Sequence, residues 1–445
     1  MSFEHVRLPF IVALLLSLAF HPGAIDAIRA QASKRQSTSN SLLTVSRNML
    51  SRAKKPNQPR VEPFIVANPA NPNHLVSATI VIESAKEWKV ELSTSVDRGK
   101  TWSVHTPEGL DQFTLSGDPW LIWSPDGMVY FSCIAIAQSR NGQAWSVFVY
   151  RSSTDGRTWS QPTRLPGDGG YDHPVLITAG QGHSLRLGVV ATLDSSVVVF
   201  RSDDAGKSFS APQRFNFQEG NVHLGGAVAL DESTIVLTYA RLDGDGQSTP
   251  MRIYATASRD GGKTFSEPIK IGEGVFNGFP LVAADLSSHR VYCVWTHRGL
   301  AYDDIYLAHS ENYGMKWSTP IRVNTLSSSA SGCMYPVLAV NPYGILVVSW
   351  HEQRSEPNHD CSAVYVTASL DGGSTFLKGV RVTPQILCSD VVGNRVGGFE
   401  VAKRWPQGGD YSGITALGDR MFMLIWSDSR TGVFRNWTAA ARIIG

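Results

Sequence analysis

Ser95–Trp102, with the sequence SVDRGKTW, sets the organisation of the chain, because five further versions of this stretch follow it. The others are Ser152–Trp159 (SSTDGRTW), Ser202–Phe209 (SDDAGKSF), Ser258–Phe265 (SRDGGKTF), Ser310–Trp317 (SENYGMKW) and Ser369–Phe376 (SLDGGSTF). In this pattern the Asp side chain can accept hydrogen bonds from the backbone amides that follow it, and the Gly can adopt the positive φ of a tight turn. Because extended runs flank each copy, the motif predicts a hairpin turn whose final aromatic residue packs beneath it.

The spacing of the copies predicts the fold. Their glycines fall at positions 99, 156, 206, 262, 314 and 373, at intervals of 57, 50, 56, 52 and 59 residues. A repeat of about 50 residues that contains several strands is typical of a β-propeller, in which each repeat forms one blade.

The six stretches resemble the Asp boxes of the sialidase superfamily, and the resemblance extends over residues 42–445. It implies an all-β propeller of four-stranded antiparallel blades, with the boxes stabilising turns rather than contacting substrate. Two copies depart from the pattern. The second has Thr154 in place of the Asp, with Asp155 one position later. The fifth has Asn312 in place of the Asp and Lys316 where Thr or Ser is usual. We expect weaker turns there in blades that still form.

The number of blades follows from the starts of the innermost strands. These lie near Glu62-Pro63, Asp118-Pro119, His173-Pro174, His223, Phe279-Pro280, Tyr335-Pro336 and Asp410-Tyr411, which gives seven starts for six boxes. The last unit ends without a box, and the segment LLTVSRN near residue 42 resembles the strands that follow the boxes. We therefore predict seven blades, closed by pairing of the two ends of the chain. Six blades remain the alternative if 61–105 or 405–445 is an appendage.

Composition restricts the cellular context and the partners. The chain has 445 residues and a formal charge of +2, which gives no indication of nucleic acid or an anionic membrane as a partner. The apolar run LPFIVALLLSLAF, followed by small residues, is typical of a secretory signal. We predict a signal peptide over 1–30, a flexible segment over 31–41 and a single domain over 42–445. The expected product is a secreted or periplasmic monomer that needs no cofactor or metal.

The five cysteines agree with export but do not require it. Cys133 and Cys293 lie in apolar strand runs and are expected to be buried thiols. Cys333, Cys361 and Cys388 lie in or just after the sixth repeat, and a disulfide between Cys361 and Cys388 would leave one thiol over. The nearby segment 383–407 exceeds the usual connection between blades, and a long insert on a propeller is more often a functional loop than an error in the repeat.

Candidate site residues gather on the face opposite the boxes. In a four-stranded antiparallel blade, the start of the first strand and the end of the second lie on that face. The strand starts contribute carboxyl, imidazole and phenol groups, namely Glu62, Asp118, Asp172, His173, His223, Tyr335, Asp410 and Tyr411. The ends of the second strands carry an aromatic residue followed by arginine, at Arg241, Arg298, Arg354 and Arg430. Arginines around one funnel could bind an acidic sugar, or each could pair with an acid of its own loop, such as Glu352 or Asp428.

The resemblance also implies site residues for part of the sialidase reaction. Tyr411-Ser412-Gly413-Ile414 is similar to the phrase that carries the family's nucleophilic Tyr, and Glu219 is similar in position to the Glu that activates it. Arg241 and Arg298 resemble two members of the family's arginine triad. The family's first triad arginine lies in a [FY]-R-[IL]-P phrase, whereas this chain has Arg60-Val61-Glu62-Pro63, which places Glu62 near the site and the arginine one residue too early. The first-blade loop offers only Glu83 and Glu87 for the family's acid/base aspartate.

These observations favour an exported, carbohydrate-active propeller that acts on a glycan or glycoconjugate. As an enzyme it would be an exo-sialidase-like glycoside hydrolase, with Tyr411, Glu219, Asp118, Glu62 or Asp410 as catalytic groups. Arg241, Arg298, Arg354, Arg430, His173, His223 and Tyr335 would then bind substrate. The alternative is a non-catalytic scaffold that binds glycan or protein. A metal-dependent lyase or hydrolase using Asp172, His173 and His223 is a third possibility, but no ligand-spacing motif supports it.

Overall fold

The computed structural model describes residues 42–139, 142–179, 186–217, 220–244, 248–325, 330–356 and 359–444, which belong to one compact unit, Leu42–Gly445. The predicted signal peptide and the segment 31–41 lie outside the described residues. None of the helices in the described part of the chain is long and apolar enough to cross a membrane.

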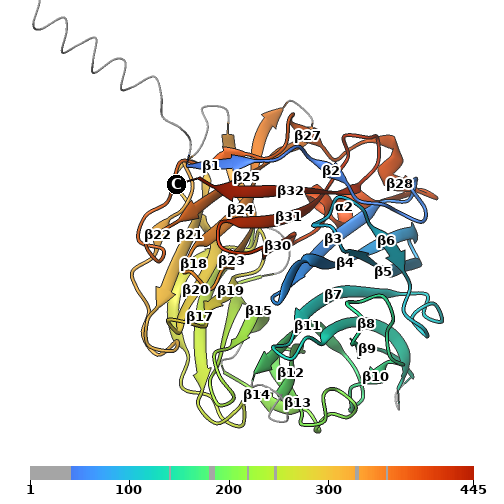
Figure 1. Cartoon of the computed structure of the whole chain (residues 1–445), viewed down its shortest axis with the longest axis vertical. Helices are drawn as coiled ribbons and strands as arrows, with labels where there is room; N and C mark the ends of the chain where they lie inside the picture. The colour runs from blue at the N-terminus through green and yellow to red at the C-terminus, as the bar shows by residue number, and fades with distance from the viewer. Residues whose placement is uncertain are drawn as a thin grey trace, which may run out of the picture. The chain divides into compact units, whose positions relative to one another are not determined.

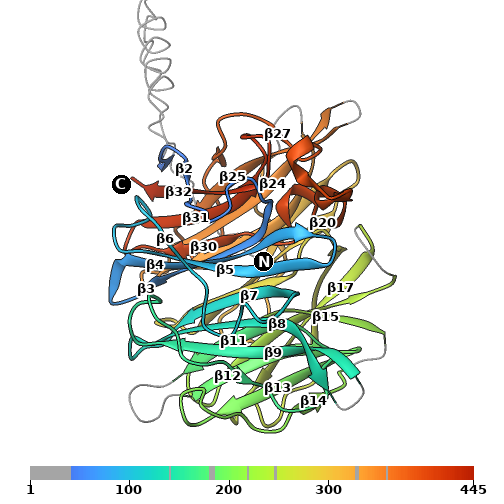
Figure 2. The same cartoon turned by 90° about the vertical axis from the view of Figure 1, so that its right-hand side faces the viewer.

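The described residues form seven antiparallel blades in a ring, as the repeat spacing predicts (Figure 1). Blade 1 consists of β3 (Arg60–Asn68), β4 (Asn71–Ser84), β5 (Glu87–Ser95) and β6 (Ser103–His105). Blade 2 consists of β7 (Ser116–Trp123), β8 (Val129–Ser139), β9 (Gly142–Ser152) and β10 (Thr163–Arg164). Blade 3 consists of β11 (Tyr171–Ala179), β12 (Arg186–Leu193), β13 (Ser196–Ser202) and β14 (Gln213–Phe215). The side view shows the strands of these three blades following one another, from blue to green (Figure 2).

The remaining blades repeat this order. Blade 4 consists of β15 (Asn221–Ala229), β16 (Ile235–Leu242), β17 (Pro250–Ser258) and β18 (Ile269–Val275). Blade 5 consists of β19 (Leu281–Asp285), β20 (Arg290–Arg298), β21 (Asp303–Ser310) and β22 (Ile321–Arg322). Blade 6 consists of β23 (Ala330–Val340), β24 (Leu346–Glu356), β25 (His359–Ser369) and β26 (Val380–Arg381). Blade 7 consists of β30 (Gly413–Ala416), β31 (Met421–Asp428), β32 (Arg435–Ile443) and β1 (Leu43–Val45), with β2 (Met49–Leu50) also paired to β32. The first strands contact one another in chain order, and β30 contacts β3 to complete the ring.

The hydrophobic core lies between neighbouring blades. Val76 and Leu92 of blade 1 belong to the same buried cluster as Leu121, Phe131 and Tyr150 of blade 2. Each sheet is thus covered on both faces, by the blade before it and the blade after it, which explains why the central strands read as nearly continuous apolar runs.

The Asp boxes form turns held by their own side chains. In the first box, Asp97 accepts a hydrogen bond from the Thr101 amide at 2.9 Å and another from the Thr101 hydroxyl at 2.6 Å. The Ser95 hydroxyl accepts the Gly99 amide at 2.8 Å, and the Trp102 indole donates to the Gly99 carbonyl at 3.1 Å. In the second box Thr154 replaces the Asp and accepts the Thr158 amide at 2.9 Å. A hydroxyl can therefore substitute for the carboxylate in this turn.

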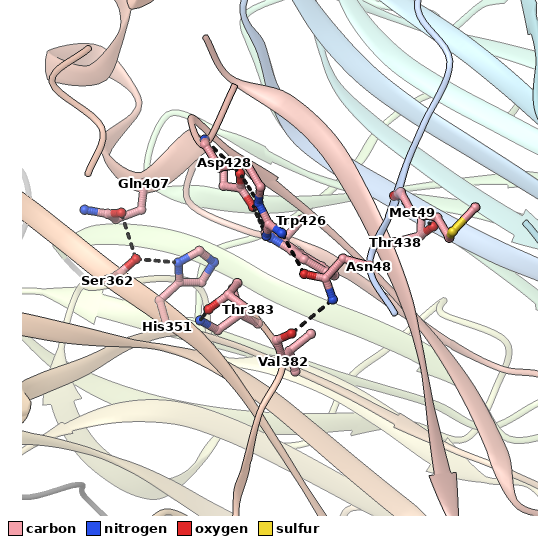
Figure 3. A network of polar contacts seen from close by, with 12 residues as sticks. Asn48, Met49, His351, Ser362, Val382, Thr383, Gln407, Trp426, Asp428 and Thr438 are labelled. Atoms are coloured by element: carbon pink, nitrogen blue, oxygen red, sulfur yellow. Dashed lines mark hydrogen bonds and ion pairs between the residues drawn. The ribbon is translucent and has the colours of Figure 1, made fainter. Parts of the chain in front are cut away.

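The N-terminal strand closes the ring, which confirms the pairing predicted for LLTVSRN. β1 pairs with β32, with Leu43 opposite Ile443. Asn48 then joins blades 6 and 7, because its side chain donates to the Val382 carbonyl at 3.0 Å and accepts from Arg430 at 2.8 Å (Figure 3). Pairing segments from opposite ends of the chain removes the two open sheet edges that an unclosed ring would present.

Candidate active site

A cavity of about 190 Å³ lies where the first strands of blades 1, 2 and 3 begin. Its polar lining is Glu62, Asp118, Asp172, His173, Arg404, Asp410 and Tyr411, and its other lining residues are Ile80, Trp88, Gly117, Ile134, Trp145, Phe279 and Trp405. Six of the candidate strand-start residues are among them: Glu62, Asp118, Asp172, His173, Asp410 and Tyr411. The structure therefore brings together side chains that are separated by up to 349 residues in the sequence.

A repeated backbone irregularity positions three of these side chains. Glu62, Asp118 and His173 each precede a proline, each lies at a register shift of its strand, and each has a positive φ, of 53°, 48° and 48° respectively. Non-glycine residues rarely adopt this conformation, which costs of order 1–3 kcal/mol and is concentrated at functional sites. Because a β-bulge changes the direction in which a side chain points, this irregularity helps to direct the three polar groups into one cavity. Tyr335 in blade 6 has the same irregularity, with a φ of 54°, but it is not among the lining residues.

Glu62 is a buried acid with 5% of its surface exposed. Burial, with the nearby negative charges of Asp410 and Asp172, raises the pKa of its carboxyl to about 8, although Arg404 and a hydrogen bond from the Asp410 backbone act in the opposite direction. The backbone approaches it closely here, since a Cβ on Gly409 would lie 2.4 Å from the Glu62 Cγ. Glu62 therefore carries a proton at neutral pH.

Asp118 is held between blades 2 and 3. Its carboxyl accepts a hydrogen bond from the His173 amide at 3.2 Å and shares another with the side chain of Asp172. Burial raises the pKa of Asp118 well above its usual range, and the charges of Asp172 and Glu62 raise it further. Asp172 itself is exposed, so this pair consists of one enclosed carboxyl group and one open to solvent.

His173 and Tyr411 line the cavity together with Phe279. The imidazole stacks on the Phe279 ring at 4.1 Å between centroids, and its centroid lies 6.1 Å from that of Tyr411. Burial lowers the pKa of His173 to about 4, so the ring is neutral at pH 7. Burial and the surrounding carboxylates, Glu62 first among them, raise the pKa of the Tyr411 phenol well above its usual range. Both groups therefore face the cavity without a charge.

The insert 383–407 supplies residues that the strand repeat does not predict. It contains β27 (Leu387–Cys388), η2 (Val392–Asn394), β28 (Arg395–Val396), β29 (Phe399–Glu400), α2 (Val401–Arg404) and the start of η3 (Pro406–Gly408). A disulfide between Cys361 and Cys388 joins it to β25, which confirms the predicted pairing. Trp405 packs edge to face against Trp88 at 5.6 Å, and the Arg404 guanidinium lies 5.0 Å from the Trp405 ring centroid. The length of the insert was the only sequence feature that pointed to this contribution.

The four arginines predicted to bind substrate lie outside the cavity lining. Arg354 pairs with Glu352 at 2.8 Å, and Arg430 pairs with Asp428 at 2.6 Å. Each pair is separated by two residues on one strand or at its end, which places both side chains on the same face. Arg298 donates to the Ser248 carbonyl at 2.8 Å, and Arg241 lies beside Gly220. The pairs that Arg354 and Arg430 form agree with the alternative in which an arginine pairs with an acid of its own loop.

The other predicted residues lie apart from the cavity or outside the described residues. Glu219 lies outside the described residues. Tyr335 is buried with 3% of its surface exposed, and its amide donates to the Asn277 carbonyl at 2.8 Å. His223 lies 5.4 Å from the Phe276 ring and acts on His173 through its charge. In the described part of the chain, no three His, Cys, Asp or Glu side chains are grouped so that they could hold a metal ion.

Comparisons with known proteins agree with this architecture. The model of the BNR repeat-like domain family matches residues 27–274. A search of curated proteins finds no match. A PL25 ulvan lyase bound to a GlcA(1-4)Rha3S ligand aligns with a TM-score of 0.53 and 11% identity, over 88% of this chain and 95% of that chain. This alignment supports the propeller fold.

Two other solved structures align less closely. The α-L-arabinofuranosidase Arb93A of Fusarium graminearum has a TM-score of 0.48 and 13% identity, over 89% and 98% of the two chains. The K499G mutant of the NanB sialidase of Streptococcus pneumoniae has a TM-score of 0.49 and 13% identity, over 69% and 68%. The family match covers more than half of the 445 residues, and the chain therefore belongs to the BNR repeat-like domain family.

Proposed function

We propose that this protein is an exo-acting glycoside hydrolase that removes a terminal sugar from a glycan in the cavity described above. The observation that carries the proposal is the position of Glu62, which lines the cavity and is buried; its burial, with the negative charges of Asp410 and Asp172 nearby, raises the pKa of its carboxyl to about 8. Glycoside hydrolysis commonly uses one carboxylic acid and one carboxylate on either side of the scissile bond. An environment that separates the pKa values of neighbouring carboxyl groups supplies both forms at neutral pH.

Glu62 is the proposed general acid. It would donate its proton to the glycosidic oxygen as the bond from that oxygen to the anomeric carbon breaks, and the bonding electrons would leave with the oxygen. Asp172, the exposed member of the carboxyl pair, would then act on the sugar as the partner carboxylate. The configuration of the released sugar, measured by NMR, assigns its role: retention indicates a nucleophile and inversion indicates a base that activates water.

Tyr411 is proposed to assist this reaction as a hydrogen-bond donor. Its phenol keeps its proton because burial, together with the surrounding carboxylates, raises its pKa. As a nucleophile, the role suggested by the resemblance of its sequence context, it would first have to transfer that proton to a neighbouring carboxylate. Comparing Tyr411→Phe with Asp172→Asn tests the assignment, since the larger loss of kcat should come from Asp172→Asn.

The lining favours a single neutral or basic sugar over an acidic one. Four carboxyl groups line the cavity, whereas Arg404 is the one arginine among its described lining residues. Its volume of about 190 Å³ is below the roughly 300–1,000 Å³ of pockets for drug-sized ligands, which suits one sugar ring rather than a chain. Carbohydrate-active proteins with this fold, such as the ulvan lyase, support a glycan substrate in general terms.

We also propose that the protein acts after export, as a single-domain monomer over 42–445. The apolar N-terminal run is typical of a secretory signal, and the Cys361–Cys388 disulfide suits an oxidising compartment. Labelling of the secreted protein with a thiol reagent after denaturation, with and without reduction, would test this. Two additional reactive thiols after reduction are expected, and an unchanged number would contradict the proposal.

The test of function is hydrolysis of a panel of fluorogenic glycosides with neutral, basic and acidic terminal sugars. We expect turnover on a neutral or basic glycoside that declines as the pH rises through about 8, where Glu62 loses its proton. Turnover of a sialoside alone would contradict the preference for uncharged or basic sugars. Absence of turnover across the panel by a folded protein would favour the alternative, a glycan-binding scaffold.

A further inference from the structure

The insert ends at Gln407, which lies between two pairs of cavity-lining residues. Arg404 and Trp405 precede it in the sequence, and Asp410 and Tyr411 follow it. Gln407 itself is not among the described lining residues, and only 5% of its surface is exposed. Because it is two residues from Trp405 and three from Asp410, a movement of Gln407 would displace both pairs.

A buried chain of hydrogen bonds holds Gln407 to blade 6 (Figure 3). The Ser362 hydroxyl of β25 donates to the Gln407 Oε1 atom at 2.8 Å, and the Ser362 oxygen lies 3.2 Å from the Nδ1 atom of His351 on β24. Burial lowers the pKa of His351 to about 4, so its ring is neutral at pH 7. Because Ser362 gives its one hydroxyl hydrogen to Gln407, His351 donates to it through Nδ1. All three side chains are buried, which strengthens hydrogen bonds between them.

Two adjacent residues of β25 hold the insert at both of its ends. Cys361 forms the disulfide with Cys388, near the start of the insert, and Ser362 binds Gln407 at its end. Blade 6 contributes none of the described lining residues of the cavity. It therefore acts on the cavity through the insert that it holds.

The backbone that follows Gln407 passes close to the proposed general acid. Gln407 has a φ of 53°, which is unfavourable for a residue with a side chain. A Cβ on Gly408 would lie 2.6 Å from the Ser427 Cβ, and a Cβ on Gly409 would lie 2.4 Å from the Glu62 Cγ. The Asp410 backbone then makes a hydrogen bond to the Glu62 carboxyl. Glycine would adopt the conformation of Gln407 more readily, so the side chain, and not the backbone, accounts for glutamine at this position.

We propose that Gln407 is a positioning residue whose bond to Ser362 fixes the segment 404–411 against the cavity and so keeps Glu62 enclosed. The inference rests on the proposed function for its effect on turnover, but the placement of the segment does not require turnover. Without the bond, the segment could move away from Glu62 and admit water. Burial is the largest cause of the raised pKa of Glu62, ahead of the charges of Asp410 and Arg404, so water should lower this pKa toward its ordinary value of 4.5.

Gln407→Gly and Ser362→Ala test this, because each removes the bond from one side. Glycine suits the φ of 53°, so Gln407→Gly should fold. Carbon-13 NMR of the carboxyl groups should show the Glu62 midpoint lowered by at least about one pH unit in each variant. On the best glycoside of the panel kcat should fall at least about tenfold, because small displacements of catalytic groups cost up to about 10²-fold. The double variant should change no more than either single variant, since both lose the same interaction.

Two matched controls separate positioning from a general loss of packing. Ser349→Ala removes a buried hydroxyl of β24, in the same blade, that donates to the Tyr365 carbonyl at 2.7 Å. Ala205→Gly relaxes a φ of 57° in the third Asp box without removing a side-chain hydrogen bond. Both variants should keep the Glu62 midpoint and kcat of the wild type.

An unchanged Glu62 midpoint in both Gln407→Gly and Ser362→Ala would overturn the inference, as would an equal shift in Ser349→Ala. A lowered midpoint in these two variants of a protein that hydrolyses no glycoside would refute the hydrolase and leave the inference standing. Hydrolysis by both variants at the wild-type rate, with the wild-type midpoint, would do the reverse.

Discussion

Asp204, in the third Asp box, and Glu62, at the start of the first strand of blade 1, are both carboxylic acids, yet the fold displaces their pKa values in opposite directions. Asp204 accepts hydrogen bonds from the Ser208 hydroxyl at 2.6 Å and from the Lys207 and Ser208 amides at 3.0 and 2.9 Å. These bonds, that from the Ser208 side chain first, lower its pKa to about 2. Burial and neighbouring acids raise that of Glu62 to about 8.

The opposite pKa shifts reflect two different roles of a carboxyl group, a structural one at Asp204 and a functional one at Glu62. On the box face, each Asp is satisfied by its own turn, so ionisation and folding favour one another. On the cavity face, Glu62 is buried close to other carboxyl groups, and three of the positions that supply polar groups to the cavity adopt an unfavourable backbone conformation. Perturbed carboxyl groups in a cavity are typical of functional sites, and we expect the cavity to reduce stability where the boxes increase it.

The largest expected effect is on activity. Glu62→Gln keeps the size of the side chain but cannot supply the proton, so kcat should fall by about 10²- to 10⁴-fold, the usual contribution of a general acid. Glu87→Gln is the matched control, because Glu87 is a half-buried acid of β5 that pairs with Lys89 and lies outside the cavity lining. Initial rates on the best glycoside of the panel measure both. A Glu62→Gln protein as active as Glu87→Gln would show that the buried acid has no part in catalysis.

The next effect is on the pH dependence of stability. Glu62 binds its proton more tightly in the folded state than its ordinary pKa of 4.5 implies, so folding stability should decline as the pH rises from about 4.5 to about 8. Glu62 can change the free energy of unfolding by at most about 1.4 kcal/mol per pH unit. Urea denaturation of the wild type and of Glu62→Gln across this pH range isolates the contribution of Glu62 to the pH dependence of stability, because His173 and the other titrating groups are common to both proteins. Parallel stability curves for the two proteins would contradict the raised pKa.

A smaller loss is expected at the boxes. Asp204→Ala removes the acceptor of the third box and should lower the free energy of unfolding by about 1 kcal/mol, reduced by the exposure of the turn to water. The adjacent Asp203 is exposed and has no hydrogen bond among those described, so Asp203→Ala serves as the control for the lost charge. Thermal unfolding should separate the two variants, with glycoside turnover unchanged in both. An activity loss in Asp204→Ala at equal folding would mean that the boxes contribute to function.

The smallest effect is a gain in the second box. Thr154→Asp restores the carboxylate of the pattern, in a turn where Thr154 already accepts the Thr158 amide at 2.9 Å. A charged acceptor should strengthen this bond and raise the free energy of unfolding by about 0.5 kcal/mol. Asp155 is already paired with His74 at 3.0 Å and should not compete for the turn. Denaturant titration of the variant would contradict this account if it showed a loss of stability.

The sequence was sufficient for the fold because the fold is periodic. The spacing of the box glycines predicted the length of each blade. The predicted strand starts included Glu62, Asp118 and His173, which line the cavity in the structure. The unpaired last unit and LLTVSRN together predicted the closure that β1 makes with β32. Each of these inferences depended on strand order and strand direction alone, and both can be read from a repeat.

The remaining lining residues depended on features without a repeat. Arg404 and Trp405 come from the insert, whose path is set by its own short elements and by the Cys361–Cys388 disulfide. Strand parity correctly predicts the face of the blade on which Arg354 lies. It does not predict whether the side chain extends toward the central axis of the propeller or pairs with Glu352, two residues away on the same strand. That choice depends on side-chain packing, although the spacing of two residues was available in the sequence as an indication of local pairing.

The most direct test of the account is the titration of Glu62 itself. Carbon-13 NMR of the side-chain carboxyl groups, with Glu62→Gln to assign the resonance, measures its pKa in the folded protein. We predict a midpoint near 8 for Glu62, whereas the box residue Asp204 should titrate near 2. A midpoint for Glu62 near 4.5, its ordinary value, would show that the cavity does not maintain a protonated acid at neutral pH and would contradict the proposed mechanism.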